Sequence, residues 1–235
     1  MKIVFFCTFC HFKMFLRNKN ELFYLWLFPL MLFLLFSSLW GYNGGYVRFL
    51  LFGIVGMSVM NNGLVSTGPF LNEQYKSGML KLLNKQDFKI IYYFIGYILS
   101  KAIIIILISS SLAIIGNVVY NCQIDIKSTG NCLMGIIAGM LIFSFISLDI
   151  TLICIKTNTF STIINLINYI ILFSSDVFYP ASQTNSTIAI IATCFPMNAI
   201  LNIIRNGDYN QWLLLWVSVP VLLFVKLIKV IDFSR

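Results

Sequence analysis

The segment 72–89, NEQYKSGMLKLLNKQDFK, decides how this chain is organised, because it is the one charge-rich stretch in the interior of the sequence. Its charged residues are Glu73, Lys76, Lys81, Lys85, Asp87 and Lys89. The segments on both sides are apolar over a length sufficient for a membrane span, roughly 20 residues. A short amphipathic piece between two such segments is too small to build a soluble domain. We therefore expect it to dock onto a partner at the membrane surface.

The composition of the chain indicates its class. Of the 235 residues, 59% are hydrophobic and only 10% are charged, whereas about a quarter of the residues of a soluble domain carry charge. So few charges cannot cover a surface that faces water. The sequence therefore predicts an all-α polytopic membrane protein, with residues 1–235 forming a single transmembrane domain.

The formal charge of +8 points to membrane orientation and not to a nucleic-acid partner. Only Arg48, Lys127 and Arg205 fall on the expected outer side, and Lys101 falls within a span. The remaining basic residues share the other side: Lys2, Lys13, Arg17, Lys19, Lys76, Lys81, Lys85, Lys89, Lys156, Lys226, Lys229 and Arg235. Basic residues gather on the cytoplasmic side of membrane proteins. We therefore expect a multi-pass plasma-membrane protein whose N- and C-termini are both cytoplasmic.

Residues 1–19 are predicted to form a helix that lies along the inner membrane surface. They are apolar but interrupted by basic residues, and Phe5, Phe9, Phe12 and Leu16 recur at helical spacing. No small-residue cleavage site of a signal peptide follows the apolar run. The segment is therefore interpreted as an interfacial helix.

Six membrane-spanning helices are predicted after this segment, at about Leu22–Leu39, Phe49–Leu71, Ile90–Ile115, Cys132–Ile155, 159–175 and Tyr209–Val225. The first contains Pro29, interpreted as a kink.

The segment 178–205, before the last span, is irregular. Phe178, Tyr179 and Pro180 end the fifth span, Pro196 divides the next apolar run, and Arg205 closes it. Because neither half of that run can cross a bilayer, we expect two short re-entrant helices dipping back from the outer face.

Four polar residues fall inside the predicted spans. Asn61 and Asn62 must face either a neighbouring helix or a wet cavity. Lys101 and Asp149 lie at similar depths on consecutive spans. Either they form an ion pair, or Lys101 extends to the inner surface while Asp149 is protonated or lines a conduit.

Two further residue pairs carry expectations about packing and covalent structure. Gly135 and Gly139 have the GxxxG spacing that allows close helix approach. Cys122 and Cys132 fall near one outer loop, where they are either bridged or free thiols.

Several motifs then resemble those of the membrane subunits of type-2 ATP-binding-cassette (ABC) transporters. In that family the loop after the second span carries an acidic residue, a glycine and an amphipathic helix, and here Glu73, Gly78 and residues 79–83 match it. Asn84-Lys85 stand where the family often has Thr-Pro. The fifth span ends in Ser175-Asp176-Val177-Phe178-Tyr179-Pro180, with Asp where the family has Gly. Pro196 to Arg205 is similar to the family's proline-led short helix before the last span.

The resemblance implies a permease that pairs with itself or a similar subunit and with two separate ATPase subunits. The contact with the ATPase would be made by Glu73, Lys76, Gly78, Leu80, Lys81, Leu82 and Leu83. No cofactor would be bound by this chain, since ATP and Mg²⁺ would sit on the partner. The implied function is ATP-driven export of a hydrophobic or amphipathic substrate, such as a peptide or bacteriocin, a drug or a lipid.

Two alternatives remain open. One is a permease that exports polysaccharide or teichoic-acid-type polymers, and the other is a non-transporting membrane immunity or scaffold protein. The sequence has no phosphate-binding Gly-x-x-x-x-Gly-Lys-Ser/Thr loop and only one histidine, so we expect no catalysis and no metal site. Cys7, Cys10 and His11 match the c-type haem attachment pattern, which we interpret as coincidence because that chemistry occurs on the other side of the membrane.

Overall fold

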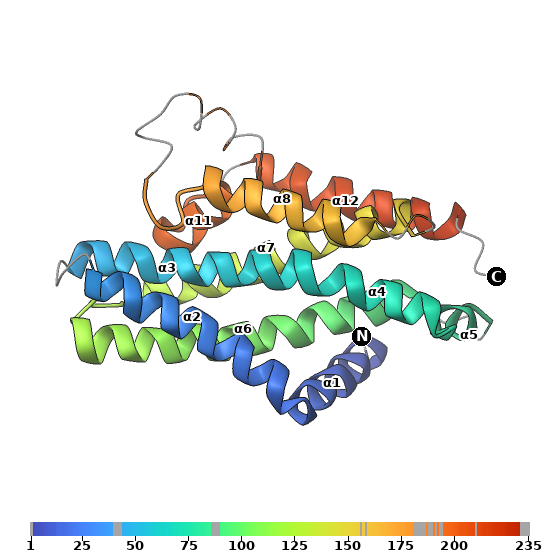
Figure 1. The fold of residues 1–235 in the computed structure, drawn as a ribbon, viewed down its shortest axis with the longest axis horizontal. Coiled ribbons are helices and arrows are strands. Elements are labelled where there is room, and N and C mark those ends of the chain that lie inside the picture. Colours follow the sequence, from blue (N-terminus) through green and yellow to red (C-terminus); the bar gives the residue numbers. More distant parts are fainter. Residues whose placement is uncertain are drawn as a thin grey trace.

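Long helices run side by side along one axis in the computed structural model (Figure 1). The structure describes residues 2–39, 44–85, 90–155, 157, 159–180, 187, 190, 192, 195–209 and 211–230. All regular elements in these ranges are helical. The all-α fold predicted from the composition is therefore confirmed.

The chain begins with two helices that meet at a sharp elbow. Helix α1 spans Lys2–Arg17 and helix α2 spans Lys19–Leu39. Asn18 breaks the helical run between them. Its Oδ1 accepts a hydrogen bond from the backbone N–H of Glu21 (3.4 Å), while its Nδ2 donates to Glu21 Oε2 (3.0 Å). The bond to Asn18 Oδ1 is an N-cap contact, in which a side-chain oxygen accepts from the backbone N–H three residues on, and it favours a new helix start at this residue.

Helix α1 matches the predicted N-terminal helix, and its packing fits a helix between protein and lipid. It lies against the helix that contains Gly96, where a Cβ would stand only 2.5 Å from Cys7 Cβ. The opposite face exposes Phe5, Phe6 and Phe9. Pro29 lies inside α2 without ending that helix.

The second predicted span is longer than the sequence suggested. Helix α3 (Gly44–Asn61), the π-helix η1 (Asn62–Ser66) and helix α4 (Thr67–Lys76) follow one another without a break, forming a helical stretch of 33 residues. The short helix α5 (Met79–Lys85) comes next. Residues 86–89, including Asp87 and Lys89 of the charged segment, lie outside the described residues.

Within the described ranges, four helices are long and apolar enough to cross a membrane by length and composition: α2, the α3–α4 stretch, α6 (Ile90–Tyr120) and α7 (Ile126–Ile153). Two shorter apolar helices follow, α8 (Phe160–Ser174) and α12 (Trp212–Val230). Helix α8 has 15 residues and is therefore roughly 22 Å long, less than the roughly 30 Å of a bilayer core. The six-span arrangement stays a prediction where it depends on α8 and α12.

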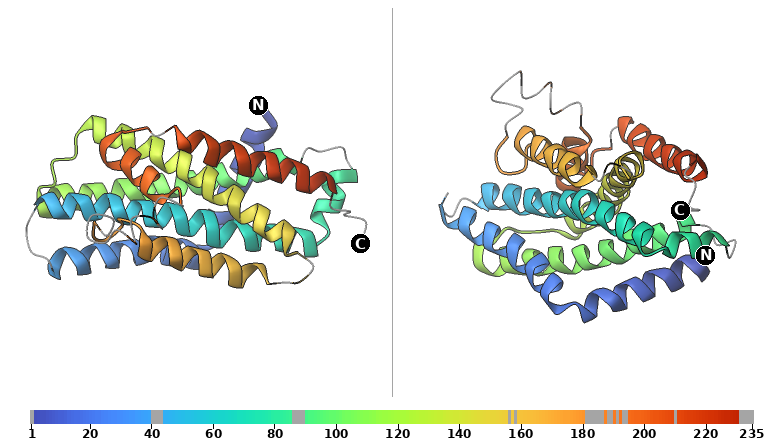
Figure 2. Two further views of the ribbon diagram at one scale, coloured as in Figure 1. Left: turned by 90° about the horizontal axis from the view of Figure 1, so that it is seen from above. Right: turned by 45° about the vertical axis from the view of Figure 1, so that its right-hand side comes forward.

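Helix α7 occupies the centre of the bundle (Figure 2). The helix α11 (Met197–Asn206) lies on it. Its other neighbours are α3, η1, α4, α6, α8 and α12. In Figure 1, α5 and the C-terminal end of α12 lie at one end of the bundle, and α11 lies toward the other.

The two glycines of the GxxxG spacing allow α11 to approach α7 closely. A Cβ at Gly135 would stand 2.3 Å from Ile204 Cγ1, and a Cβ at Gly139 would stand 2.6 Å from Val59 Cγ1 and 3.2 Å from Ile200 Cγ2. The prediction of a close helix approach at these glycines is confirmed. Its partner is the short helix after Pro196 together with α3.

We expect Gly135→Ala to destabilise the protein by about 1–3 kcal/mol, because the added methyl group overpacks the contact between α7 and α11. Gly130→Ala on the same helix is the matched control, since a Cβ there meets nothing within 4 Å and alanine favours a helix by up to about 1 kcal/mol. Thermal unfolding of the purified protein in detergent measures both. Equal unfolding temperatures for the two variants would contradict the close approach.

Candidate functional site

The predicted contact segment folds as a tight turn between two helices. Helix α4 ends at Lys76, and the backbone N–H groups of Ser77 and Gly78 donate to the carbonyls of Glu73 (2.9 Å) and Tyr75 (3.2 Å). Gly78 has φ +75°, in the left-handed region that glycine adopts without strain. This glycine therefore sets the angle at which α5 leaves α4.

Helix α5 is amphipathic, as the sequence predicted, and the structure shows which leucines anchor it. Leu80 and Leu83 are buried, at 1% and 8% exposure, whereas Leu82 is 57% exposed. Lys81 and Lys85 are also exposed. Because α5 contacts α4 and α6, two leucines hold it against the bundle and leave an outward face that includes Lys81, Leu82 and Lys85.

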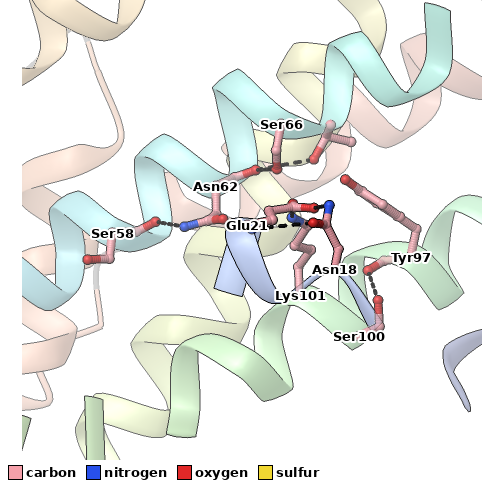
Figure 3. A network of polar contacts seen from close by, with 9 residues as sticks. Asn18, Glu21, Ser58, Asn62, Ser66, Tyr97, Ser100 and Lys101 are labelled. Carbon is pink, nitrogen blue, oxygen red and sulfur yellow. Dashed lines mark hydrogen bonds and ion pairs between the residues drawn. The ribbon is translucent and has the colours of Figure 1, made fainter. Parts of the chain in front are cut away.

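Asn61 and Asn62 lie at the junction between α3 and η1, where the helix widens. Asn62 is buried, and its Nδ2 donates to the carbonyl of Ser58 (2.9 Å); Asn61 is half-buried. The carbonyl of Asn62 accepts from Ser66 Oγ (2.5 Å). The Asn62 side chain therefore bonds to its own helix (Figure 3), and the choice between a neighbouring helix and a wet cavity stays a prediction.

The π-helix and the first residue of α4 also make polar contacts with α7. Ser147 Oγ donates to the carbonyl of Leu64, and Thr67 Oγ1 donates to Ser144 Oγ (3.3 Å). A Cβ on Gly63 would stand 2.6 Å from Phe143 Cβ. Wide helical turns leave carbonyls without intrahelical partners, and here serine from α7 satisfies one of them. This seam ties the middle of the α3–α4 stretch to the central helix.

Of the two alternatives for Lys101 and Asp149, the ion pair between them is not what the structure shows. Lys101 Nζ bonds to Glu21 Oε1 at 2.6 Å (Figure 3). It also lies 3.8 Å from the ring centroid of Phe15. Glu21 directly precedes the predicted first span, Leu22–Leu39, and was not considered as a partner for Lys101. The elbow between α1 and α2 packs beside the middle of α6, so the carboxylate reaches a lysine that shows no exposure.

Asp149 is buried on α7 and is not paired with Lys101. It is 6% exposed, and its Oδ1 has no hydrogen-bond partner among the described residues. The second alternative also fails for Lys101, which pairs with Glu21 inside the protein and does not extend to the surface, while the role given there to Asp149 stays a prediction. Glu21 is the functional residue that the sequence analysis missed; its signal was an acidic residue three positions after a candidate N-cap, Asn18.

His11 is the second residue that the sequence analysis left without a structural role. It is 4% exposed, and its ring meets the edges or faces of three aromatic rings, with centroids 5.5 Å from Phe70, 4.7 Å from Tyr93 and 5.5 Å from Tyr97. Burial lowers the pKa of His11 to about 4. The histidine is therefore neutral at pH 7 and fastens α1 to α4 and α6.

At the other end of the bundle, Arg205 fixes the irregular segment that follows α8. Its Nη2 donates to the carbonyls of Phe49 (3.2 Å), Asp176 (2.7 Å) and Val177 (3.4 Å), and its guanidinium lies 3.6 Å from the Phe49 ring centroid. Gly53 leaves room for this approach, since a Cβ there would meet the Val177 carbonyl. Non-helical backbone near a membrane needs such internal partners.

The remaining residues of the predicted re-entrant segment divide between described and undescribed parts. The carbonyl of Phe178 accepts from the Tyr46 hydroxyl (3.0 Å), Tyr179 is 58% exposed, and Pro196 precedes α11 as its N-cap. Most of the first predicted re-entrant helix, within 181–194, lies outside the described residues. Cys122 and Cys132 are free thiols, which decides between the two alternatives for them.

We expect loss of Glu21 to damage the protein more than loss of Lys101. Glu21→Leu strands a fully buried ammonium and should cost about 3–5 kcal/mol, whereas after Lys101→Met the half-buried Glu21 carboxylate, at 37% exposure, can turn toward water. The double variant should recover most of the loss. Unfolding temperatures in detergent measure all three. Asp149→Asn is the control, and rescue of Lys101→Met by this change instead of by Glu21→Leu would contradict the observed pair.

Acidification should destabilise the docking of α1 through His11. Its folded-state pKa of about 4 lies below the ordinary 6.5, so the unfolded state binds more protons and stability falls as pH drops through 6.5 toward 4. The expected loss between pH 7.5 and pH 5 is about 2 kcal/mol. Unfolding temperatures of the wild type and His11→Phe at both pH values measure it. An equal drop in the variant would contradict this role, because phenylalanine does not titrate.

The sequence was compared with models of known protein families and with curated proteins. The family model described as ABC-2 type transporter matches residues 4–209, which run from α1 to just beyond α11. No curated protein matches the sequence significantly. The family match covers the turn at Gly78, the Ser175–Pro180 segment and the helix that ends near Arg205, the motifs on which the resemblance was based. The chain belongs to the ABC-2 type transporter family, whose members are membrane transport components that work with an ATPase subunit.

Proposed function

We propose that this chain is the permease subunit of an ABC exporter, and that the outward face of α5 binds its ATPase subunit. Two permease copies and two ATPase subunits would form the transporter. ATP and Mg²⁺ would bind to the ATPase, and the exported substrate would be hydrophobic or amphipathic. The protein would lie in the plasma membrane with both termini in the cytoplasm.

The observation that carries this proposal is the anchoring of α5. A helix of seven residues is marginal in water on its own, yet this one is held by buried Leu80 and Leu83 and presents Leu82 outward. An exposed apolar side chain flanked by Lys81 and Lys85 suits the rim and core of a protein interface. Helix α5 directly follows the end of the 33-residue helical stretch Gly44–Lys76.

The attachment of α5 to the rest of the bundle supports a role in transmitting motion. Only Ser77 and Gly78 separate it from α4, which continues through η1 into α3. The seam between η1 and α7 joins this stretch to the central helix. A displacement of α5 by a partner would therefore move a continuous 33-residue helical stretch. It would also change the contacts of this stretch with α7.

The distribution of charge supports the proposed orientation. Lys76, Lys81 and Lys85 gather around α5, and Lys226 lies in the last turns of α12, whose C-terminal end is at the same end of the bundle (Figure 1). At the other end lie Arg48 and Arg205, both engaged by polar groups of the fold. Basic residues on one side favour a cytoplasmic α5.

An uncovered apolar face on α8 supports the proposed pairing of two permeases. Leu166, Tyr169 and Phe173 are 60%, 58% and 77% exposed on this helix. Their spacing of three and four residues places them on one side. Such a face suits a second copy or the lipid between copies, and either would let an amphipathic substrate enter along an apolar path.

We expect Leu82→Asp to reduce the amount of ATPase that copurifies with the tagged permease by tenfold or more, because a central interface residue contributes about 2 kcal/mol. Ile126→Asp is the matched control. Ile126 is 94% exposed at the first residue of α7 and lies toward the other end of the bundle. Unchanged copurification in Leu82→Asp, or an equal loss in Ile126→Asp, would contradict the proposed contact.

A second pair of variants tests whether ATPase binding depends on the angle at which α5 leaves α4, without changing the exposed side chains of α5. Gly78→Val should weaken copurification because a β-branched residue disfavours positive φ, whereas Gly78→Asn should retain it because asparagine tolerates that region. No atom lies within 4 Å of the Cβ position, so neither change introduces a clash. Equal behaviour of the two variants would show that the turn angle does not matter for binding.

A further inference from the structure

A cavity of about 420 Å³ lies between the elbow of α1 and α2 on one side and α4 on the other. Its volume falls within the range of small-molecule sites. Glu21, Glu73, His11, Ser66, Phe70 and Tyr97 are among the residues that line it. Figure 3 shows Glu21, Ser66 and Tyr97 gathered from three different helices around this space.

The charge of the cavity is negative. Its lining includes two carboxylates, Glu21 and Glu73, and contains no lysine or arginine among the described residues. Lys101 lies behind Glu21 and neutralises it through their ion pair. Glu73 forms no ion pair with any residue that the structure describes. One negative charge is therefore left over at the mouth of the cavity, where it favours a cation.

A buried acceptor without a partner also lines the cavity. The ring of His11 is 96% buried, as its 4% exposure shows, and its Nε2 has no hydrogen-bond partner in the described part of the chain. Because burial lowers the pKa of His11 to about 4, the ring is neutral at pH 7 and does not repel a cation. Buried polar atoms normally have hydrogen-bond partners, so we expect a ligand or a water molecule to donate a hydrogen bond to His11 Nε2.

Aromatic rings supply the remaining walls. Phe70 and Tyr97 stack with their centroids 3.8 Å apart, and both line the cavity beside Phe15. The protein already places one ammonium against these rings, since Lys101 Nζ lies 3.8 Å from the Phe15 centroid and 5.8 Å from that of Tyr97. Aromatic faces combined with a carboxylate are the usual surroundings of a bound organic ammonium.

We propose that this cavity is a binding site for an organic ammonium ion that carries an apolar chain. The cation lies between Glu73 and the aromatic rings of Phe70 and Tyr97. His11 Nε2 accepts a hydrogen bond when the ammonium has an N–H group. The apolar chain lies along the ring faces toward the open side of the cavity.

This inference deepens the proposed function, on which it rests only where it names the class of substrate. An amphipathic ammonium could reach the site as a transported molecule or as the headgroup of phosphatidylethanolamine, which carries the same group. Binding itself needs neither the ATPase subunit nor transport. A measurement on the purified permease therefore tests the site even where the exporter proposal fails.

The experiment is calorimetric titration of the purified permease with hexyltrimethylammonium, in neutral detergent and in nanodiscs with or without phosphatidylethanolamine. N-hexylacetamide is the neutral comparison ligand. We expect saturable binding of the cation and at least tenfold weaker binding of the amide. Glu73→Gln should weaken cation binding about tenfold and Phe70→Leu about fivefold, while Phe70→Tyr retains it. Asp208→Asn, an exposed acidic residue outside the cavity lining, should bind as the wild type does.

The outcomes separate the possibilities. Weaker apparent binding in the phosphatidylethanolamine nanodiscs identifies the lipid headgroup as a competing occupant. Equal binding in both kinds of nanodisc identifies a free ammonium ligand. Both outcomes support the site. Absence of saturable binding overturns it. Equal affinity for the amide, or an equal loss in Asp208→Asn and Glu73→Gln, also overturns it. ATP-driven uptake of the same cation by the assembled transporter tests the exporter proposal separately.

Discussion

The full burial of one positive charge is the constraint on which the N-terminal half of this protein depends. Lys101 shows no exposure on α6, and an ammonium in such a place is stable only with a close carboxylate. Glu21 supplies it from the first turn of α2. To bring Glu21 there, the chain must break at Asn18 and carry α1 across α6. The elbow, the docking of His11 and the cavity beside α4 all follow from that placement.

Much of the architecture could be predicted from the sequence because bilayers impose strong rules. Apolar run length predicted the helices around Lys19–Leu39, Ile90–Tyr120 and Ile126–Ile153, with ends that differ by several residues. Gly135 and Gly139 predicted a close contact because only glycine lets backbones approach so nearly. Gly78 indicated the turn before α5, since an amphipathic helix had to begin just after it.

The polar contacts of the interior could not be predicted in the same way. Depth along a helix is readable from sequence, but rotation about its axis and the path of a neighbouring elbow are not. Lys101 and Asp149 have similar depths in the sequence, yet Glu21 reaches Lys101 from the first turn of α2, beside the elbow. The same limit hid the role of His11, because its partners Phe70, Tyr93 and Tyr97 come from two later helices.

The π-helix at Asn62–Ser66 has a consequence for the two halves of the span that contains it. A wide turn absorbs one residue more than an α-helical turn, so the residues after it are rotated by roughly 100° from their positions in a continuous α-helix, and the helix is shorter by roughly 1.5 Å. The stripe of side chains that α3 directs at α11 is therefore out of phase with the stripe that α4 directs at α7 and α8. Tightening this wide turn to ordinary α-helical winding would twist α4 and α5 like a screw while α3 stayed still. The junction thus stores a rotational degree of freedom between the two ends of one continuous helix.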